Sequence, residues 1–192
     1  MGRRVTLLFM ARVDHKKIRQ LIAQKQKTVT DRQFFSSRAF AAYFADMALA
    51  QTRRYGYHRR VKVRTVWEPK NGNTAMTNNE LIWLNAGHPS ITQHKSRAER
   101  YAQLCGLFAH ELGHVLYTDF ITSQTHLTRL DSGFWYPEPP PLRTSREQHA
   151  EEELWDYSGD SRKHQSMVRF IMHDIMNILE DGYIEQRMIA EY

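Results

Sequence analysis

The chain has 192 residues, of which 41% are hydrophobic and 25% are charged. This length suffices to bury a sizeable core, and it favours one domain that spans residues 1–192. The single cysteine, Cys105, excludes an internal disulfide, which fits a cytoplasmic protein. No apolar run reaches the roughly 18 residues that a membrane-spanning helix needs, so we expect no membrane partner.

The formal net charge of +6 is unevenly distributed along the chain. Residues 1–70 hold 17 Lys and Arg against 4 Asp and Glu, whereas residues 71–192 hold 10 against 17. A basic cluster interleaved with two tyrosines lies in the first half: Arg53, Arg54, Tyr55, Tyr57, His58, Arg59, Arg60, Lys62 and Arg64. Such a cluster can bind nucleic acid or an acidic partner, or it can be a solvated face or pair with the acidic half of the same molecule.

The first half of the chain predicts helices followed by strands. Residues 13–27 suggest a polar helix, and residues 38–54 carry apolar side chains at helical spacing. Residues 61–67 alternate apolar and basic side chains, as a half-buried strand does. After a turn at residues 69–73, residues 81–84 form a second predicted strand. This strand is a candidate edge strand that could bind an extended substrate by adding to the sheet.

The most informative segment is Ala109–Tyr117, where His110 and His114 lie four residues apart and Glu111 follows the first histidine. On a helix these two histidines share one face, so both imidazoles can bind one metal ion. This is the H-E-x-x-H arrangement of zinc peptidases. Isolated histidines are usually surface or core residues. Burying three such polar groups in an apolar helix is costly unless they are paired or bind a metal, which favours a metal site.

The last third predicts a long connection and then a final helix. Residues 121–165 contain four prolines and an acidic run, and we expect them to be mostly loop. Residues 166–189 show apolar side chains at helical spacing. Their polar side chains form one narrow stripe, which is either a solvated face or the lining of a site: His173, Asn177, Glu180, Asp181 and Glu185.

A zinc peptidase needs a third protein ligand, and this stripe is the best place to seek it. We expect Glu180 to be that ligand. Asp181 or Glu185 would then accept a hydrogen bond from a ligand histidine and orient its ring. Asp119 is a weaker candidate ligand, because no glycine turn follows His114 to swing the chain back, and a structural role suits it better.

The catalytic expectations follow from metal chemistry. Bound zinc would acidify a water molecule, and Glu111 would accept its proton and pass it to the leaving amine. A tyrosine or histidine could stabilise the oxyanion, and Tyr117, Tyr183 and His173 are the candidates. His164 and His173 are also possible metal ligands, of lower rank than Glu180.

Two segments together resemble a known family. His110–Phe120 and Asn177–Glu185 are similar to motifs of the metallopeptidase domain of bacterial and phage proteins that carry a von Willebrand factor A-type domain downstream. The resemblance implies a zincin-like α+β fold, with a small sheet packed on the H-E-x-x-H helix and on a C-terminal helix that carries a glutamate ligand. It also implies Zn²⁺ as cofactor, a protein or peptide substrate and a chain that could be the N-terminal part of a longer protein.

Two other classes of function stay open at this point. The first is a non-catalytic interaction module that zinc stabilises, which a closed site with four protein ligands would favour. The second is a nucleic-acid-associated protein that uses the basic N-terminal half, which a steep salt dependence of binding would favour.

Overall fold

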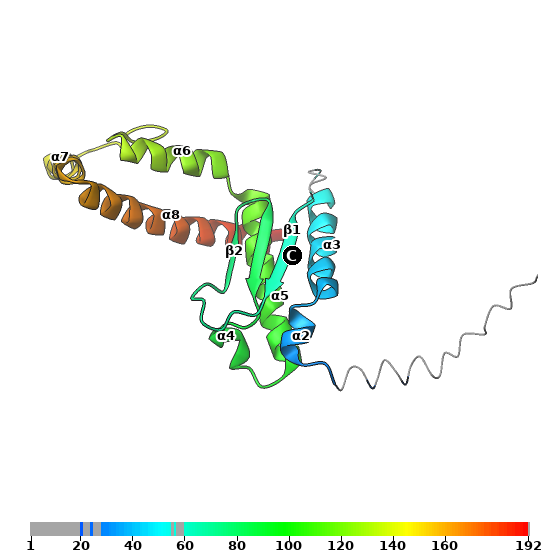
Figure 1. Cartoon of the computed structure of the whole chain (residues 1–192). Helices are drawn as coiled ribbons and strands as arrows, with labels where there is room; N and C mark the ends of the chain where they lie inside the picture. Colours follow the sequence, from blue (N-terminus) through cyan, green and yellow to red (C-terminus); the bar gives the residue numbers. More distant parts are fainter. Residues whose placement is uncertain (1–19, 21–23, 25–27, 55, 57–59, 192) are drawn as a thin grey trace, which may run out of the picture.

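The computed structural model of the chain describes residues 20, 24, 28–54, 56 and 60–191. The fold is α+β and mostly helical, with one small sheet (Figure 1). The elements follow one another as α2 (Asp31–Phe35), α3 (Arg38–Arg54), β1 (Lys62–Val66), β2 (Ala75–Thr77), β3 (Leu81–Asn85), α4 (Pro89–Thr92), α5 (Arg97–Tyr117), α6 (Phe120–Asp131), α7 (Ser145–Asp160) and α8 (Arg162–Glu191).

The sheet has the strand order β1-β3-β2, with β1 parallel and β2 antiparallel to β3. The prediction that residues 81–84 form an edge strand is therefore wrong, because β3 lies between the other two strands. Ile82 and Leu84 are fully buried there, as befits a central strand. The strand next to the site is β2, whose three residues are too few to give a periodic signal.

Helices α3 and α5 pack together on the sheet and form the core with it. The rings of Phe44 on α3 and Phe108 on α5 lie 4.6 Å apart between centroids, and both belong to one cluster with Ile82 and Leu84. The predicted helix over residues 38–54 is confirmed. We call α2, α3, α4, α5 and the sheet the body of the molecule.

The remaining helices, α6, α7 and α8, form an arm that extends from one end of α5 (Figure 1). The prediction that residues 121–165 are mostly loop is wrong, since they contain most of α6 and all of α7. The periodic signal was weak because α6 buries only Leu127 and Leu130 and because no residue of α7 is buried. A capping box of Thr144 and Glu147 begins α7 and was the available sequence signal.

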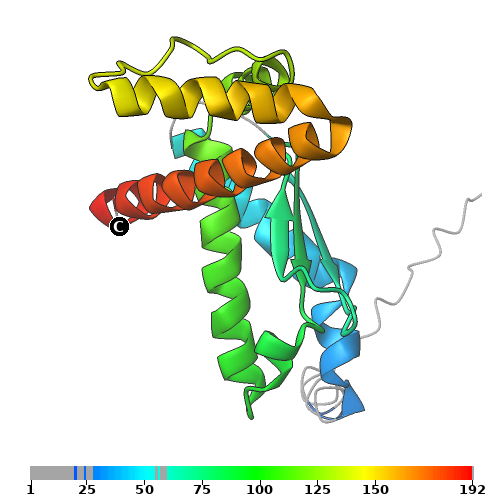
Figure 2. The same ribbon diagram turned by 90° about the vertical axis from the view of Figure 1, so that its left-hand side faces the viewer.

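Helix α8 is longer than the predicted 166–189 and crosses α5 near the H-E-x-x-H motif (Figure 2). The crossing is close at Gly113, where an added Cβ would lie 3.3 Å from Cγ of Met188 and 3.5 Å from Cδ1 of Ile184. The glycine thus allows α8 to approach α5 between the two histidines. This approach brings the polar stripe of α8 to the motif.

Two further sequence predictions concern a helix near the N-terminus and the absence of a membrane span. Of the expected helix over residues 13–27, only residues 20 and 24 are described, so the prediction stays open. Among the described helices, none is both long and apolar enough to cross a membrane.

Candidate metal centre

The H-E-x-x-H motif lies in the C-terminal half of α5. A capping box of Ser96 and Glu99 begins this helix, which runs unbroken to the motif. The side chains of His110 and His114 are partly buried, at 28% and 17% exposure, and Glu111 is buried, with only 7% of its surface exposed. The helix therefore presents all three groups in a partly desolvated environment rather than on an open surface.

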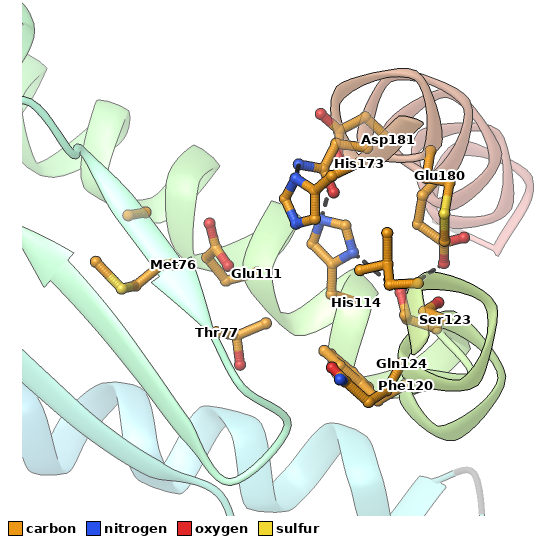
Figure 3. A pocket seen from close by; sticks show the side chains of 15 residues that line it. Met76, Thr77, Glu111, His114, Phe120, Ser123, Gln124, His173, Glu180 and Asp181 are labelled. Carbon is orange, nitrogen blue, oxygen red and sulfur yellow. Dashed lines mark hydrogen bonds and ion pairs between the residues drawn. The ribbon is translucent and has the colours of Figure 1, made fainter. Parts of the chain in front are cut away.

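The two histidines of this motif on α5 converge with a third side chain, which comes from α8. Nε2 of His110 lies 3.5 Å and Nε2 of His114 lies 3.2 Å from the same oxygen, Oδ1 of Asp181 on α8. One ligand atom from each of the three side chains lies within 4.8 Å of the other two. Figure 3 shows Asp181 close to His114, joined by a dashed line.

These distances fit a zinc ion. Two ligand atoms that each lie ~2.1 Å from a tetrahedral zinc ion are separated by about 3.4 Å. The two nitrogen–oxygen separations at Asp181 are close to this value. Two neutral imidazoles and one carboxylate are also a common donor set for zinc. His110, His114 and Asp181 could therefore hold a metal ion.

Asp181, and not Glu180, is the carboxylate that meets the two histidines. Oε1 of Glu180 accepts a hydrogen bond of 2.6 Å from Oγ1 of Thr118. The sequence expectation of Glu180 as the ligand therefore departs from the arrangement in the structure. Successive side chains on a helix point about 100° apart, so the rotation of α8 about its axis selects between these neighbours. Sequence spacing alone does not contain that rotation.

Glu185, which was expected to accept a hydrogen bond from a ligand histidine, lies near His110 but beyond hydrogen-bond distance. Oε1 of Glu185 lies 3.8 Å from Nδ1 of His110, the ring nitrogen that does not face Asp181. This separation is too long for a hydrogen bond but close enough for electrostatic attraction. Acidic side chains of α8 therefore lie beside both histidines.

Burial and charge shift the proton affinities of this cluster. Desolvation by burial, followed by repulsion from Asp181, raises the pKa of Glu111 to about 7. Desolvation, together with the nearby His110, lowers the pKa of His114 below its usual value. A histidine that favours its neutral form is suited to bind a metal, because the metal needs a free nitrogen lone pair.

The cluster opens into a cavity of about 500 Å³ bounded by β2, α5, α6 and α8. Figure 3 shows Met76 and Thr77 of β2 on one side, and Phe120, Ser123 and Gln124 at the start of α6 on the other. Glu111, His114, Glu180 and Asp181 line the same space. Polar groups capable of chemistry thus face a space large enough for part of a peptide.

The other expected residues lie in different places. His173 lines the cavity, and its Nδ1 is 3.1 Å from the amide nitrogen of Asn177. Tyr183 is 48% exposed and does not belong to the cavity lining. Asp119 caps α6 by accepting hydrogen bonds from Ile121 and Thr122, which agrees with the structural role expected for it. Nδ1 of His164 lies 3.0 Å from Oδ2 of Asp160 on the preceding helix, and His164 is also outside the cavity.

Thr118 is the residue of this site that the sequence analysis did not single out. It caps the C-terminal end of α5, four residues after His114. Its Oγ1 lies 3.0 Å from Nδ1 of His114, in addition to its bond to Glu180. The spacing of four residues on one helix could have indicated this contact, because such pairs lie one above the other.

The basic cluster is only partly described. Residues 55 and 57–59 lie outside the described part of the chain. Arg53 and Arg54 end α3, and the exposed Lys62 and Arg64 lie on β1, away from β2 and its cavity. The possible binding of nucleic acid or an acidic partner by this cluster stays a prediction.

The comparisons with known proteins add no relative. No protein-family model matches the chain, and neither a curated protein nor a solved structure matches it.

Proposed function

We propose that the chain is a zinc-dependent metallopeptidase with a zincin-like site, in which His110, His114 and Asp181 bind the metal. The observation that carries the proposal is the convergence of both Nε2 atoms on one oxygen of Asp181, beside a buried glutamate in a cavity. With Asp181 in place of Glu180, the third ligand would differ from the glutamate that the resemblance to the von Willebrand-associated metallopeptidase domain implies.

A bound zinc ion acidifies water and polarises a carbonyl group. Proton transfer would be the task of Glu111, whose carboxylate lines the same cavity as His114 and Asp181. A carboxylate beside the proposed ligands can accept a proton and later release it. Glu111 would take the proton from the attacking water and pass it to the amine of the cleaved peptide.

The edge strand suggests how a peptide would be held. Strand β2 pairs with β3 on one side only, and Ala75, Met76 and Thr77 all line the cavity. An extended peptide could add to this edge through main-chain hydrogen bonds and place its carbonyl beside the metal. His173 lines the cavity and remains a candidate to stabilise the oxyanion, whereas Tyr183 lies outside the lining.

The number of ligands bears on the alternative of a zinc-stabilised interaction module. Structural zinc sites are normally closed by four protein ligands, whereas catalytic sites leave a position open. Among the described residues, the potential ligand group contains three side chains, and it borders the cavity. This favours a catalytic site over a purely structural one.

The first test is the metal content of the purified protein. We expect about one zinc per chain, and we expect His110→Ala, His114→Ala and Asp181→Ala to lose it. His149→Ala is the matched control, because this histidine is exposed on α7, far from the motif in sequence and outside the ligand group. A wild-type protein that takes up no zinc, or three ligand variants that retain it fully, would refute the site.

The second test is hydrolysis of a mixed peptide library, followed by mass spectrometry. Glu111→Gln preserves the shape of the side chain but cannot accept a proton, so it should retain zinc and lose cleavage by a factor of at least about 100. If this variant cleaves at the wild-type rate, Glu111 is not the base. If the zinc-loaded wild type cleaves no peptide of the library, the peptidase assignment fails while the metal site stands.

A further inference from the structure

The second nitrogen of His114 takes part in a chain of hydrogen bonds that crosses from α5 to α8. Nδ1 of His114 lies 3.0 Å from Oγ1 of Thr118. The same hydroxyl donates a hydrogen bond of 2.6 Å to Oε1 of Glu180. Figure 3 labels His114 and Glu180, and dashed lines at each of them mark these contacts. Glu180 is thereby connected to the ring of a proposed metal ligand without touching it.

The positions of the protons along this chain follow from what each group can donate. An ionised carboxylate offers only acceptors, and a hydroxyl has one hydrogen to donate. Because Thr118 donates its hydrogen to Glu180, its oxygen can only accept from His114. The proton of the neutral imidazole must then be on Nδ1, which leaves a free lone pair on Nε2. Nε2 is the nitrogen that lies 3.2 Å from Asp181.

We propose that Glu180 and Thr118 act as positioning residues that hold His114 in the Nδ1–H tautomer and so present Nε2 to the metal. This inference rests on the proposed metal site and assigns Glu180 a different part from the ligand role that its sequence context suggests. A partner on the distal nitrogen of a ligand histidine fixes the ring and makes it a stronger ligand.

The local fold explains why a threonine can perform this task. Thr118 ends α5, and its backbone N–H donates to the carbonyl oxygen of His114 at 2.9 Å. Its extended backbone then leads directly into α6, which Asp119 caps. The side chain of Thr118 is therefore held one helical turn beyond His114, between the ring and α8.

Among the described residues, no comparable chain of hydrogen bonds reaches the other proposed ligand, His110. Nδ1 of His110 faces Oε1 of Glu185 at 3.8 Å, beyond hydrogen-bond distance. The two histidines are thus held differently: His114 by a chain of two short bonds, and His110 by a longer electrostatic contact. Loss of the Thr118 hydroxyl should therefore affect metal binding through His114 alone.

The test is zinc affinity, measured by competition with a chromogenic chelator. Thr118→Val has nearly the same shape as threonine but lacks the hydroxyl, and we expect it to weaken zinc binding roughly 10- to 100-fold. Thr118→Ser restores the hydroxyl and should bind zinc within about threefold of wild type. Glu180→Gln keeps an acceptor oxygen for Thr118 and should lose far less affinity than Asp181→Asn.

Two further measurements separate positioning from general damage. Because the residues act in series, the double variant Thr118→Val with Glu180→Ala should bind zinc no more weakly than the weaker single variant. Nitrogen-15 NMR of the zinc-free protein should show His114 with its proton on Nδ1 in the wild type. In Thr118→Val a population with the proton on Nε2 should appear, while the exposed His149 should not change.

The outcomes distinguish the inference from the proposal beneath it. If the wild type binds no zinc, the metal site itself fails. If the wild type binds zinc and Thr118→Val binds it equally well with an unchanged tautomer, only the positioning role fails. If Glu180→Gln loses as much affinity as Asp181→Asn, Glu180 is a direct ligand and the chain of hydrogen bonds is incidental.

Discussion

The body and the arm are built in contrasting ways. The body has one continuous core in which Phe44, Leu84 and Leu104 are fully buried. The arm buries few side chains, and much of its cohesion comes from polar contacts. Arg169 on α8, for example, pairs with Asp131 and donates to the carbonyl oxygen of Leu127 at 3.0 Å. We therefore expect the stability of the body to come from its own core, and that of the arm to depend on docking against the body.

The proposed metal site lies where these two parts meet. His110, Glu111 and His114 belong to the body, and Asp181 and Glu180 belong to the arm. Ile184 is fully buried at this junction and lies close to Gly113. A modest apolar contact thus positions the third ligand. A metal that binds both parts would strengthen the junction, because binding to the folded state alone stabilises that state.

The contrast between body and arm should be clearest when a buried leucine in each part is replaced by alanine. Leu104→Ala in the body should lower the free energy of unfolding by about 4 kcal/mol, because the space that the lost side chain leaves lies in a closed core. Leu130→Ala in the arm should cost less, since its neighbours can relax toward solvent. Denaturant unfolding measures both, and hydrogen exchange should show Leu130→Ala loosening the arm alone. Equal global losses would mean that body and arm share one core.

Glu111 should make the stability of the zinc-free protein depend on pH. Its pKa rises from 4.5 to about 7 on folding, so the folded state binds the proton more tightly. This pKa difference contributes to the free energy of unfolding. The contribution is fully present below pH 4.5 and is lost as the pH rises through 7, which lowers the free energy of unfolding by on the order of 3 kcal/mol.

Glu111→Gln cannot lose this contribution, so it should be the more stable protein at pH 8 and lose that advantage toward pH 4.5. Thermal unfolding in the presence of a chelator at several pH values is the measurement. Parallel curves for the two proteins would show that folding does not raise the pKa of Glu111.

Zinc should stabilise the docked arm. At a free zinc concentration 100 times its dissociation constant, the free energy of unfolding should rise by about 2.7 kcal/mol. Hydrogen exchange should slow most around Asp181 in α8 and around His114 in α5. His114→Ala is the control and should gain nothing. Stabilisation of the variant to the same extent would place the bound zinc elsewhere.

The smallest effect is expected for Asp119→Ala at the start of the arm. Its carboxylate caps α6, and the backbone N–H of Thr122 is the first cause of its lowered pKa. The variant should fray the first turn of α6 and leave zinc affinity within about twofold of wild type, because the Asp119 carboxylate contacts α6 rather than a proposed ligand. A large loss of zinc would return Asp119 to the list of ligands.

The sequence was most informative where one element contains the whole pattern. His110, Glu111 and His114 lie within two turns of one helix, so their shared face follows from helix geometry alone. The helix over residues 38–54 and the strands β1 and β3 followed from apolar patterning for the same reason, whereas β2 did not. Periodicity was uninformative for α7, which buries no residue, and it could not distinguish a central strand from an edge strand.

Relations between elements were decided only by the tertiary structure. Which of Glu180 and Asp181 meets the histidines depends on how α8 is rotated against α5, and that rotation is set by the close contact of Gly113 with Ile184 and Met188. The bond from Thr118 to Glu180 likewise joins residues 62 positions apart in the chain. Sequence periodicity specifies the face that a helix buries, but the packing of two helices determines which atoms on those faces come within bonding distance.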